Sequence, residues 1–118
     1  MQANDYQKKT IETAIYPGAG TGNDLELYYL AMGVTSEAGE IAGKVKKLLR
    51  DNKLNVGELA YEIGDVCWYV ARLADALGYD FEDILEINYT KLIKRKNNDT
   101  IQGNGDNRWG NASSHSRP

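Results

Sequence analysis

The chain has 118 residues, of which 42% are hydrophobic and 26% charged, as expected for one soluble globular domain. Its 14 Lys and Arg residues against 17 Asp and Glu residues give a net charge of −3, which argues against binding nucleic acid through the phosphate backbone. A single cysteine, Cys67, and a single histidine, His115, exclude an internal disulfide, a thiolate metal cage and a histidine-rich metal site.

Neither a targeting segment nor a membrane span is predicted. The N-terminal residues 1–9 lack the apolar stretch of a signal peptide. The sequence contains no run of 18 or more apolar residues, the length that a transmembrane helix needs. We therefore expect a cytoplasmic protein without a membrane partner.

Four helices are predicted, over residues 5–15, 24–49, 56–77 and 81–94. The first two are separated by residues 16–23, where Pro17 and three glycines indicate a loop. Asn55 is the predicted N-cap of the third helix and Gly78 its predicted C-terminal stop. Apolar residues recur in that helix at steps of three and four, which is typical of an amphipathic helix: Ile63, Val66, Val70, Leu73 and Leu77.

Three glycines, Gly33, Gly39 and Gly43, lie inside the second predicted helix. Each costs a helix about 1 kcal/mol relative to alanine, so each needs a structural reason. Gly39 and Gly43 are four residues apart and therefore suit the close approach of another helix or of a ligand. A break in the helix near Gly33 is the other interpretation.

After Arg95 the sequence turns to loop-forming residues without apolar periodicity. We therefore divide the chain into a helical domain, residues 1–95, and a C-terminal tail, residues 96–118. The predicted fold is all-α, a four-helix bundle with an irregular tail. Because one short and two long helices bury limited surface in a monomer, we expect a homo-oligomer, either a dimer or a tetramer.

Two pairs of acidic residues stand out, Glu37 with Glu40 and Glu62 with Asp65. Acids three residues apart share a helical face and repel each other by roughly 0.2–0.5 kcal/mol, and a bound cation reverses that sign. Because the 21 residues 41–61 between the pairs include a polar turn, antiparallel packing of the two helices can bring all four acids together. Carboxylate oxygens suit Mg²⁺ or Mn²⁺.

The spacing alone leaves a simpler interpretation open, in which the acids form two solvated helix faces. A di-iron carboxylate bundle is disfavoured, because it needs Glu-x-x-His pairs. Here the second members of the pairs are Glu40 and Asp65, and the one histidine lies near the C-terminus.

With their surroundings, these acids resemble the MazG-like nucleoside triphosphate pyrophosphohydrolases. The pattern of that all-α family is Glu-x-x-Glu, a spacer of one or two dozen residues, and Glu-x-x-Asp. Residues 35–40 and 62–69 look like the core of the family, and residues 88–95 look like its Asn-x-x-Lys-Leu-x-x-Arg stretch. Residues 103–108 resemble the tail of small stand-alone members, often phage-borne. For a phage-encoded protein the expected compartment is the host cytoplasm.

The resemblance implies a metal-dependent hydrolase that splits a nucleoside triphosphate into the monophosphate and pyrophosphate by water attack at the α-phosphorus. It implies that Mg²⁺, or Mn²⁺ as a substitute, is held by Glu37, Glu40, Glu62 and Asp65. Glu37 or Glu40 would then take the proton of the attacking water.

Further residues are candidates for contacts with the nucleotide. Asn88, Lys91 and Arg95 share one face of the last predicted helix and are expected to bind phosphate or sugar, although a cation at a helix end also complements the helix dipole. Lys44 and Lys47 follow Glu40 and are candidates for phosphate contact, a solvated basic face being the alternative. The candidate base pocket consists of Trp68, Tyr69 and Trp109.

Two other functions remain open at this point. A phosphoribosyl-ATP pyrophosphohydrolase shares the fold and the acid pattern of the family. A non-catalytic helical interaction module would carry the same acids as a solvated face and would gain no stability from a divalent cation.

Overall fold

The computed structural model describes residues 1–99, in which all regular secondary structure is helical. In chain order the elements are α1 (Ala3–Thr10), the 3₁₀ turn η1 (Ile11–Thr13), α2 (Asp24–Asp51), α3 (Val56–Ala76) and α4 (Phe81–Asn97). The predicted all-α class with four helices is confirmed. None of the helices in this range is long and apolar enough to cross a membrane. The chain divides into two compact units, residues 1–81 and the residues from Glu82 onward, and each is described by itself.

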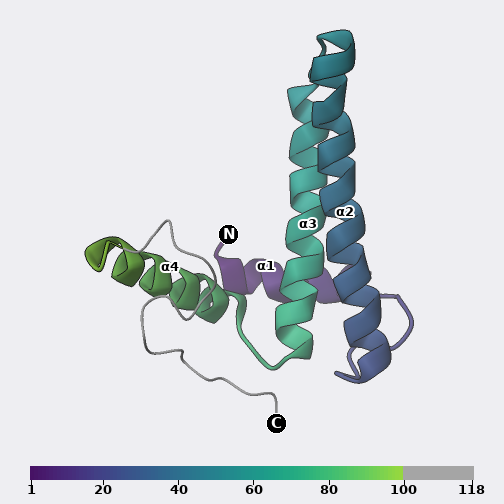
Figure 1. Cartoon of the computed structure of the whole chain (residues 1–118). Helices are drawn as coiled ribbons and strands as arrows, with labels where there is room; N and C mark the ends of the chain where they lie inside the picture. The colour runs from purple at the N-terminus through teal and green to yellow at the C-terminus, as the bar shows by residue number, and fades with distance from the viewer. Residues whose placement is uncertain (100–118) are drawn as a thin grey trace. The chain divides into compact units, whose positions relative to one another are not determined.

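In the first unit, α2 and α3 form an antiparallel helical hairpin (Figure 1). Short polar side chains define where these helices begin. The side chain of Asn23 accepts a hydrogen bond from the Glu26 amide at 3.0 Å, and that of Asn55 accepts one from the Glu58 amide at 3.1 Å. Each thereby satisfies an amide that the first helical turn leaves without a partner. The N-cap predicted at Asn55 is confirmed.

The hairpin turns at Asn52 and ends at Gly78, both of which have left-handed backbone conformations. Asn52, with a φ of 54°, ends α2. Gly78, with a φ of 83°, follows α3, and the next amide, that of Tyr79, returns to the Ala74 carbonyl at 2.9 Å. This is the glycine stop that the sequence predicts.

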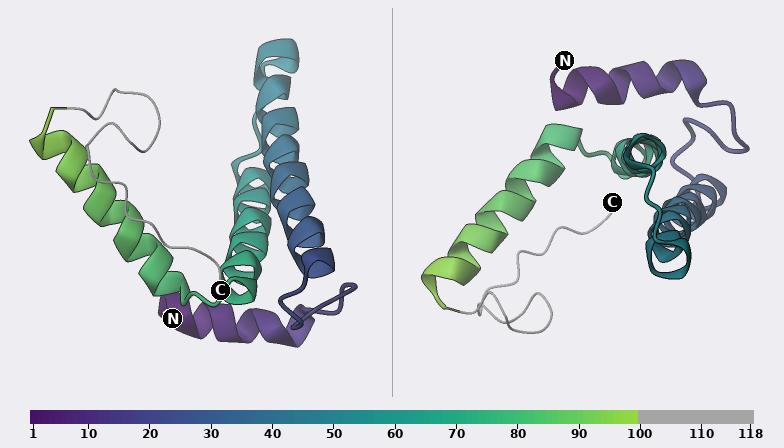
Figure 2. Two further views of the ribbon diagram at one scale, coloured as in Figure 1. Left: turned by 60° about the horizontal axis from the view of Figure 1, so that its bottom comes forward. Right: turned by 90° about the horizontal axis from the view of Figure 1, so that it is seen from above.

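Helix α1 runs crosswise to the hairpin, near the end where α2 begins and α3 ends (Figures 1 and 2). It is fixed there by Gln7, whose amide group donates to the carbonyls of Ala71 at 3.2 Å and Tyr79 at 3.0 Å. The carbonyl oxygen of the same side chain accepts from the Phe81 amide at 3.0 Å. The core at this end is consequently part polar, with Gln7, Thr10, Glu26 and Arg72 buried beside Leu30 and Ala71.

The structure also departs from the sequence-based expectations. The first helix ends at Thr10 and continues only as the turn η1, and Ile63 is 51% exposed although it belongs to the apolar stripe of α3. Helix α1 contacts α3 around Ala71, at the end of the hairpin where α3 ends. Toward the other end, this unit contains only α2 and α3 (Figure 2), so no third helix of the unit covers Ile63. Helix α2 is continuous through Gly33, so the glycine does not mark a break.

Candidate active site

Three carboxylates converge between the two helices of the hairpin. Glu37 comes from α2, and Glu62 and Asp65 come from α3. One oxygen of each lies within 4.8 Å of the others. Glu37 and Glu62 are half-buried, and Asp65 is exposed. We call these three residues the acid trio; it contains three of the four acids predicted to gather here.

The acid trio fits a small divalent cation. Mg²⁺ holds oxygen ligands at about 2.0–2.1 Å in an octahedron, so its ligand oxygens lie roughly 3–4 Å apart. One oxygen of each trio residue lies within 4.8 Å of the others, a separation that a shared cation would have to shorten only slightly. All the donors are hard carboxylate oxygens, which suit Mg²⁺ or Mn²⁺ better than a soft transition metal.

Burial and the neighbouring acids together raise the pKa of Glu37. Burial raises the pKa of this carboxyl group, and so does its hydrogen bond with Glu62. The charges of Asp65, Glu62 and Glu40 raise the pKa further, because a negative neighbour disfavours the ionised form. The site thus concentrates negative charge that a bound cation would relieve.

The fourth predicted acid, Glu40, is exposed and does not belong to the converging group. It is close enough for its charge to raise the pKa of Glu37. Its role as a metal ligand or a base stays a prediction.

Of the two lysines predicted to contact phosphate, Lys44 and Lys47, only Lys44 contacts α3 in the described part of the chain. Lys44 Nζ lies 3.6 Å from Glu58 Oε2 and 3.9 Å from Glu62 Oε1, and the Lys44 side chain is 23% exposed. Lys44 therefore links α2 to α3 beside the acid trio, whereas Lys47 is exposed. A solvated basic face describes Lys47 but not Lys44.

A pocket of about 340 Å³ adjoins the acid trio. It is lined by two members of the trio, by the two described residues of the predicted base pocket, and by one residue of η1: Glu37, Asp65, Trp68, Tyr69 and Thr13. The hydroxyl of Thr13 accepts a hydrogen bond of 2.8 Å from Trp68 Nε1. The pocket thus has carboxylates and aromatic rings in one wall, a combination suited to a ligand with both charged and planar parts.

The aromatic part of the wall extends away from the acids. The rings of Trp68 and Tyr69 meet edge to face, with centroids 5.0 Å apart and planes at 84°. Tyr16, from the loop before α2, presents a second perpendicular contact to Trp68 at 5.9 Å and stacks on Tyr29 at 4.9 Å. Such pairs add to the stability gained from burying the rings, so each ring helps to fix the next.

The packing of Tyr69 explains why position 33, inside α2, is a glycine. A Cβ atom on Gly33 would lie 2.7 Å from Cζ of Tyr69 and closer still to Cδ1 and Cε1. The absence of a side chain lets the Tyr69 ring cross α2 one turn before Glu37. Tyr69 also lines a second hollow of about 300 Å³, together with Tyr29, Met32, Gly33 and Ser36. No other helix approaches Gly39 or Gly43 closely in the described part of the chain, since a Cβ on either would meet nothing within 4 Å beyond the backbone of its own helix. The approach of a ligand there stays a prediction.

The predicted phosphate-binding residues Asn88, Lys91 and Arg95 lie on α4 and belong to the second unit. Their spacing places them along one side of the helix, where Asn88 is exposed, Lys91 half-buried and Arg95 buried. Their contact with a nucleotide stays a prediction. Trp109 lies outside the described residues.

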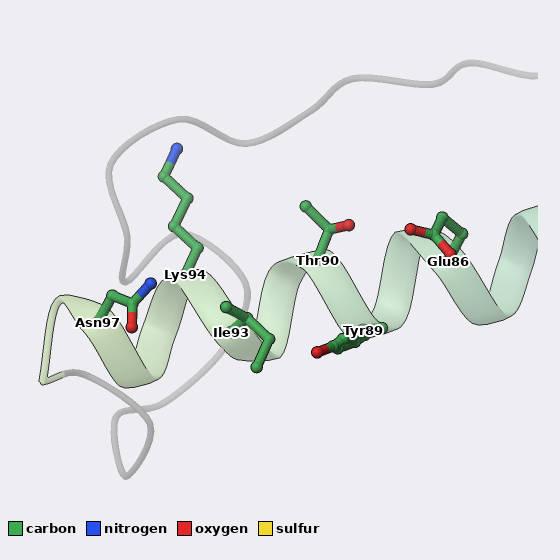
Figure 3. A pocket seen from close by; sticks show the side chains of 6 residues that line it. All are labelled: Glu86, Tyr89, Thr90, Ile93, Lys94 and Asn97. Atoms are coloured by element: carbon green, nitrogen blue, oxygen red, sulfur yellow. The ribbon is translucent and has the colours of Figure 1, made fainter.

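Helix α4 also carries a hollow of about 360 Å³ (Figure 3). It is lined by residues at helical spacing, none of them predicted from the sequence: Glu86, Tyr89, Thr90, Ile93, Lys94 and Asn97. The lining mixes one carboxylate, one ammonium group and neutral side chains, without the grouped acids of the hairpin.

The sequence does not identify Thr13 as part of the pocket wall, or Tyr16 as a ring that contacts Trp68. Thr13 was placed inside the first helix and Tyr16 in a loop, and both meet Trp68 only through the fold. Thr13 and Trp68 are 55 residues apart in the chain, and no local sequence pattern predicts their contact.

Comparison with known proteins identifies relatives of the chain. Residues 27–100 match the family model described as the MazG nucleotide pyrophosphohydrolase domain. The Gene 37 protein of Mycobacterium phage L5 is 47% identical over 114 residues, which cover 92% of this chain and 100% of that protein. No solved structure gives a significant match. The matched range contains the whole acid trio, and a phage relative agrees with the resemblance to phage-type members.

Proposed function

Since the chain belongs to the MazG nucleotide pyrophosphohydrolase family, we propose that it hydrolyses a nucleoside or deoxynucleoside triphosphate to the monophosphate and pyrophosphate. The observation that carries this proposal is the convergence of Glu37, Glu62 and Asp65 at the edge of a pocket walled by Trp68 and Tyr69. Charged phosphates and a planar base are the two parts of the substrate that such a pocket would separate.

The proposed cofactor is Mg²⁺, with Mn²⁺ as a substitute. The acid trio would hold it, with Glu40 as the fourth predicted ligand. When bound, such an ion neutralises phosphate oxygens and lowers the pKa of a coordinated water. The raised pKa of Glu37 supports this assignment, because the trio gains most from a cation where its own carboxylates repel each other.

The protein's own groups would move the proton and orient the substrate. Glu37 or Glu40 accepts the proton of the water that attacks the α-phosphorus. Pyrophosphate leaves with the electron pair of the broken bond between the α-phosphorus and the bridging oxygen. Glu37 and Asp65 line the pocket, so the scissile bond would lie beside these two carboxylates.

The nucleoside would occupy the aromatic side of the pocket. Trp68 and Tyr69 offer faces for stacking a base, and a base–aromatic stack contributes about 1–3 kcal/mol in nucleic-acid complexes. The volume of about 340 Å³ lies within the range of small-molecule sites. Trp109 is the remaining member of the predicted base pocket.

Cationic side chains would hold the outer phosphates. Lys44, beside Glu62, is the best placed in the first unit, and Lys47 is a weaker candidate. On α4 the proposed contacts come from Asn88, Lys91 and Arg95, of which an arginine offers paired donors to phosphate oxygens.

Self-association is part of the proposal. The first unit exposes large apolar side chains along α2, among them Leu25, Tyr28, Met32 and Leu49, which are 53%, 62%, 66% and 91% exposed. Apolar patches of this kind are typical of interfaces. Light scattering coupled to size-exclusion chromatography should give a mass of two or four chains, and a monomer at micromolar concentration would contradict this part.

A nucleotide panel tests the reaction. The chain is incubated with ribonucleoside and deoxyribonucleoside triphosphates and with phosphoribosyl-ATP, with and without Mg²⁺, and pyrophosphate release is measured. We expect Mg²⁺-dependent release that Glu37→Gln abolishes. Asp51→Asn is the control: it removes one carboxylate from the same helix, where Asp51 pairs with Arg50 and with no other ionic partner among residues 1–99.

The outcomes of the nucleotide panel distinguish the proposed function from its alternatives. Turnover of phosphoribosyl-ATP alone would replace the proposed substrate by that of the alternative enzyme. No turnover of any nucleotide, together with no Mg²⁺-dependent rise in melting temperature, would favour the non-catalytic interaction module. Equal turnover by Glu37→Gln and the unaltered chain would refute the site.

A further inference from the structure

One buried carboxylate holds the loop that precedes α2. Glu26 is 1% exposed and accepts three hydrogen bonds: from the Tyr16 hydroxyl at 2.6 Å and from the amides of Gly20 and Gly22 at 2.8 Å each. Gly20 and Gly22 have φ values of 78° and 67°, which glycine adopts more readily than residues with a Cβ atom. With these φ angles, the amides of Gly20 and Gly22 point toward the Glu26 carboxylate.

An ionised carboxylate suits this arrangement best. All three partners of Glu26 donate, so each carboxylate oxygen must accept. Burial by itself raises the pKa of Glu26, but the hydrogen bonds from Tyr16, Gly20 and Gly22 and the charge of Arg72 outweigh burial and lower it. Glu26 is therefore charged at neutral pH, with a cationic neighbour that is itself buried.

Arg72 ties this cluster to α1. Its Nε donates to Thr10 Oγ1 at 2.7 Å, and its terminal nitrogen donates to the Gln7 carbonyl at 3.2 Å and pairs with Asp75 at 3.0 Å. The loop held by Glu26 and the helix held by Arg72 flank η1 on both sides in the chain. The turn that carries Thr13 is thus anchored at its two ends.

The segment anchored in this way supplies part of the pocket wall. Thr13 accepts the indole hydrogen bond of Trp68, and Tyr16 meets the same indole edge to face and stacks on Tyr29. Glu26 is linked to the wall through Tyr16, whose hydroxyl it binds and whose ring contacts Trp68. It touches neither the acid trio nor the pocket, whose lining does not include it.

We infer that Glu26 is a positioning residue, which fixes the Tyr16 loop and η1 so that Trp68 is oriented beside the acid trio before any ligand binds. Preorganisation of this kind lowers the ordering cost of binding. The consequence for nucleotide affinity rests on the proposed function, whereas the orientation of Trp68 does not.

The test is the substitution Glu26→Gln. The amide replaces one acceptor oxygen by a donor, so at least one of the three donors that now meet an oxygen would face another donor. The charge-matched control is Glu12→Gln, which removes an exposed carboxylate from η1. Both are made in a Trp109→Phe parent, in which Trp68 is the one remaining tryptophan, and their fluorescence and acrylamide quenching are recorded without nucleotide.

We expect Glu26→Gln to raise the acrylamide quenching constant of Trp68 at least twofold over the parent, while Glu12→Gln leaves it unchanged. In the chain that retains Trp109, Glu26→Gln should raise the KM for the best nucleotide about tenfold with a smaller change in kcat. Its Mg²⁺-dependent gain in melting temperature should remain, because the acid trio is untouched. A purely structural role would lower stability without separating KM from kcat.

Unchanged quenching and emission of Trp68 in a folded Glu26→Gln variant would overturn the inference. If that variant does not fold, Tyr16→Phe decides, because it removes the 2.6 Å hydrogen bond and keeps the stacked ring; unchanged quenching there would equally overturn it. A chain without pyrophosphohydrolase activity would refute the proposed function alone, since the quenching experiment needs no substrate.

Discussion

Replacing Gly33 by alanine tests the packing beside the acid trio most directly. The new Cβ would lie 2.7 Å from Tyr69 Cζ and closer to two other ring carbons, whereas unstrained carbon contacts are about 3.5–4.0 Å. The Tyr69 ring must therefore move by about 1 Å or more. Overpacking of this kind costs about 1–3 kcal/mol, while alanine in place of a helical glycine contributes about 1 kcal/mol of stability.

The expected net effect is a loss of between about zero and 2 kcal/mol in the free energy of unfolding, from the difference of these two terms. Gly43→Ala is the matched control, because it lies in the same helix and its Cβ would meet no atom of the described chain within 4 Å; it should gain about 1 kcal/mol. Equilibrium urea unfolding followed by circular dichroism, at one fixed protein concentration, measures both.

Stabilisation of Gly33→Ala as large as that of Gly43→Ala would refute the close contact of Tyr69 with α2. Activity gives a second readout. Because the displaced ring belongs to the pocket wall, Gly33→Ala should bind the substrate more weakly even if its stability is nearly unchanged. A stable and fully active variant would show that Tyr69 does not contact the substrate.

Three further outcomes follow from the site and its supports. Mg²⁺ should raise the melting temperature of the unaltered chain and of Asp51→Asn but not of Glu37→Gln, as followed by differential scanning fluorimetry. The affinity for Mg²⁺ should fall on acidification, beginning at a higher pH than for an ordinary glutamate, because the raised pKa of Glu37 keeps its carboxyl protonated; calorimetry at several pH values measures this. Glu26 has a lowered pKa in the fold, so its contribution to stability is present above its unfolded pKa and is lost as the pH falls through its folded pKa. The stability difference between the unaltered chain and Glu26→Gln should therefore be largest near neutral pH and shrink in acid, as urea unfolding across a pH series would show.

Features encoded by neighbouring residues could be predicted from the sequence. The cap at Asn55 and the stop at Gly78 follow from short-range hydrogen bonding and backbone freedom. The gathering of Glu37, Glu62 and Asp65 follows from helical spacing and one tight turn. The cap and the stop depend on a few adjacent positions, and the gathering of the trio requires in addition only that two consecutive helices pack antiparallel.

Features set by the packing of distant segments could not be predicted. Glu26 reads as an ordinary acid in the first turn of a helix, and its burial depends on a loop whose glycines adopt positive φ. The contact between Thr13 and Trp68 depends on the crosswise path of α1. Gly33 could be recognised as unusual, but its partner Tyr69 lies on another helix.

The place of the acid trio partway along the hairpin bears on how this architecture tolerates change in length. Residues 41–61, with the turn at 52–55, form an arm that continues past the trio. Whole helical turns gained or lost equally by both sides of that arm leave the same three carboxylates facing one another, since each turn restores the direction of every side chain. The geometry of the acid trio is thus a property of one cross-section of the paired helices. The length of the arm would therefore matter less to the trio than the spacing of the acids within each pair.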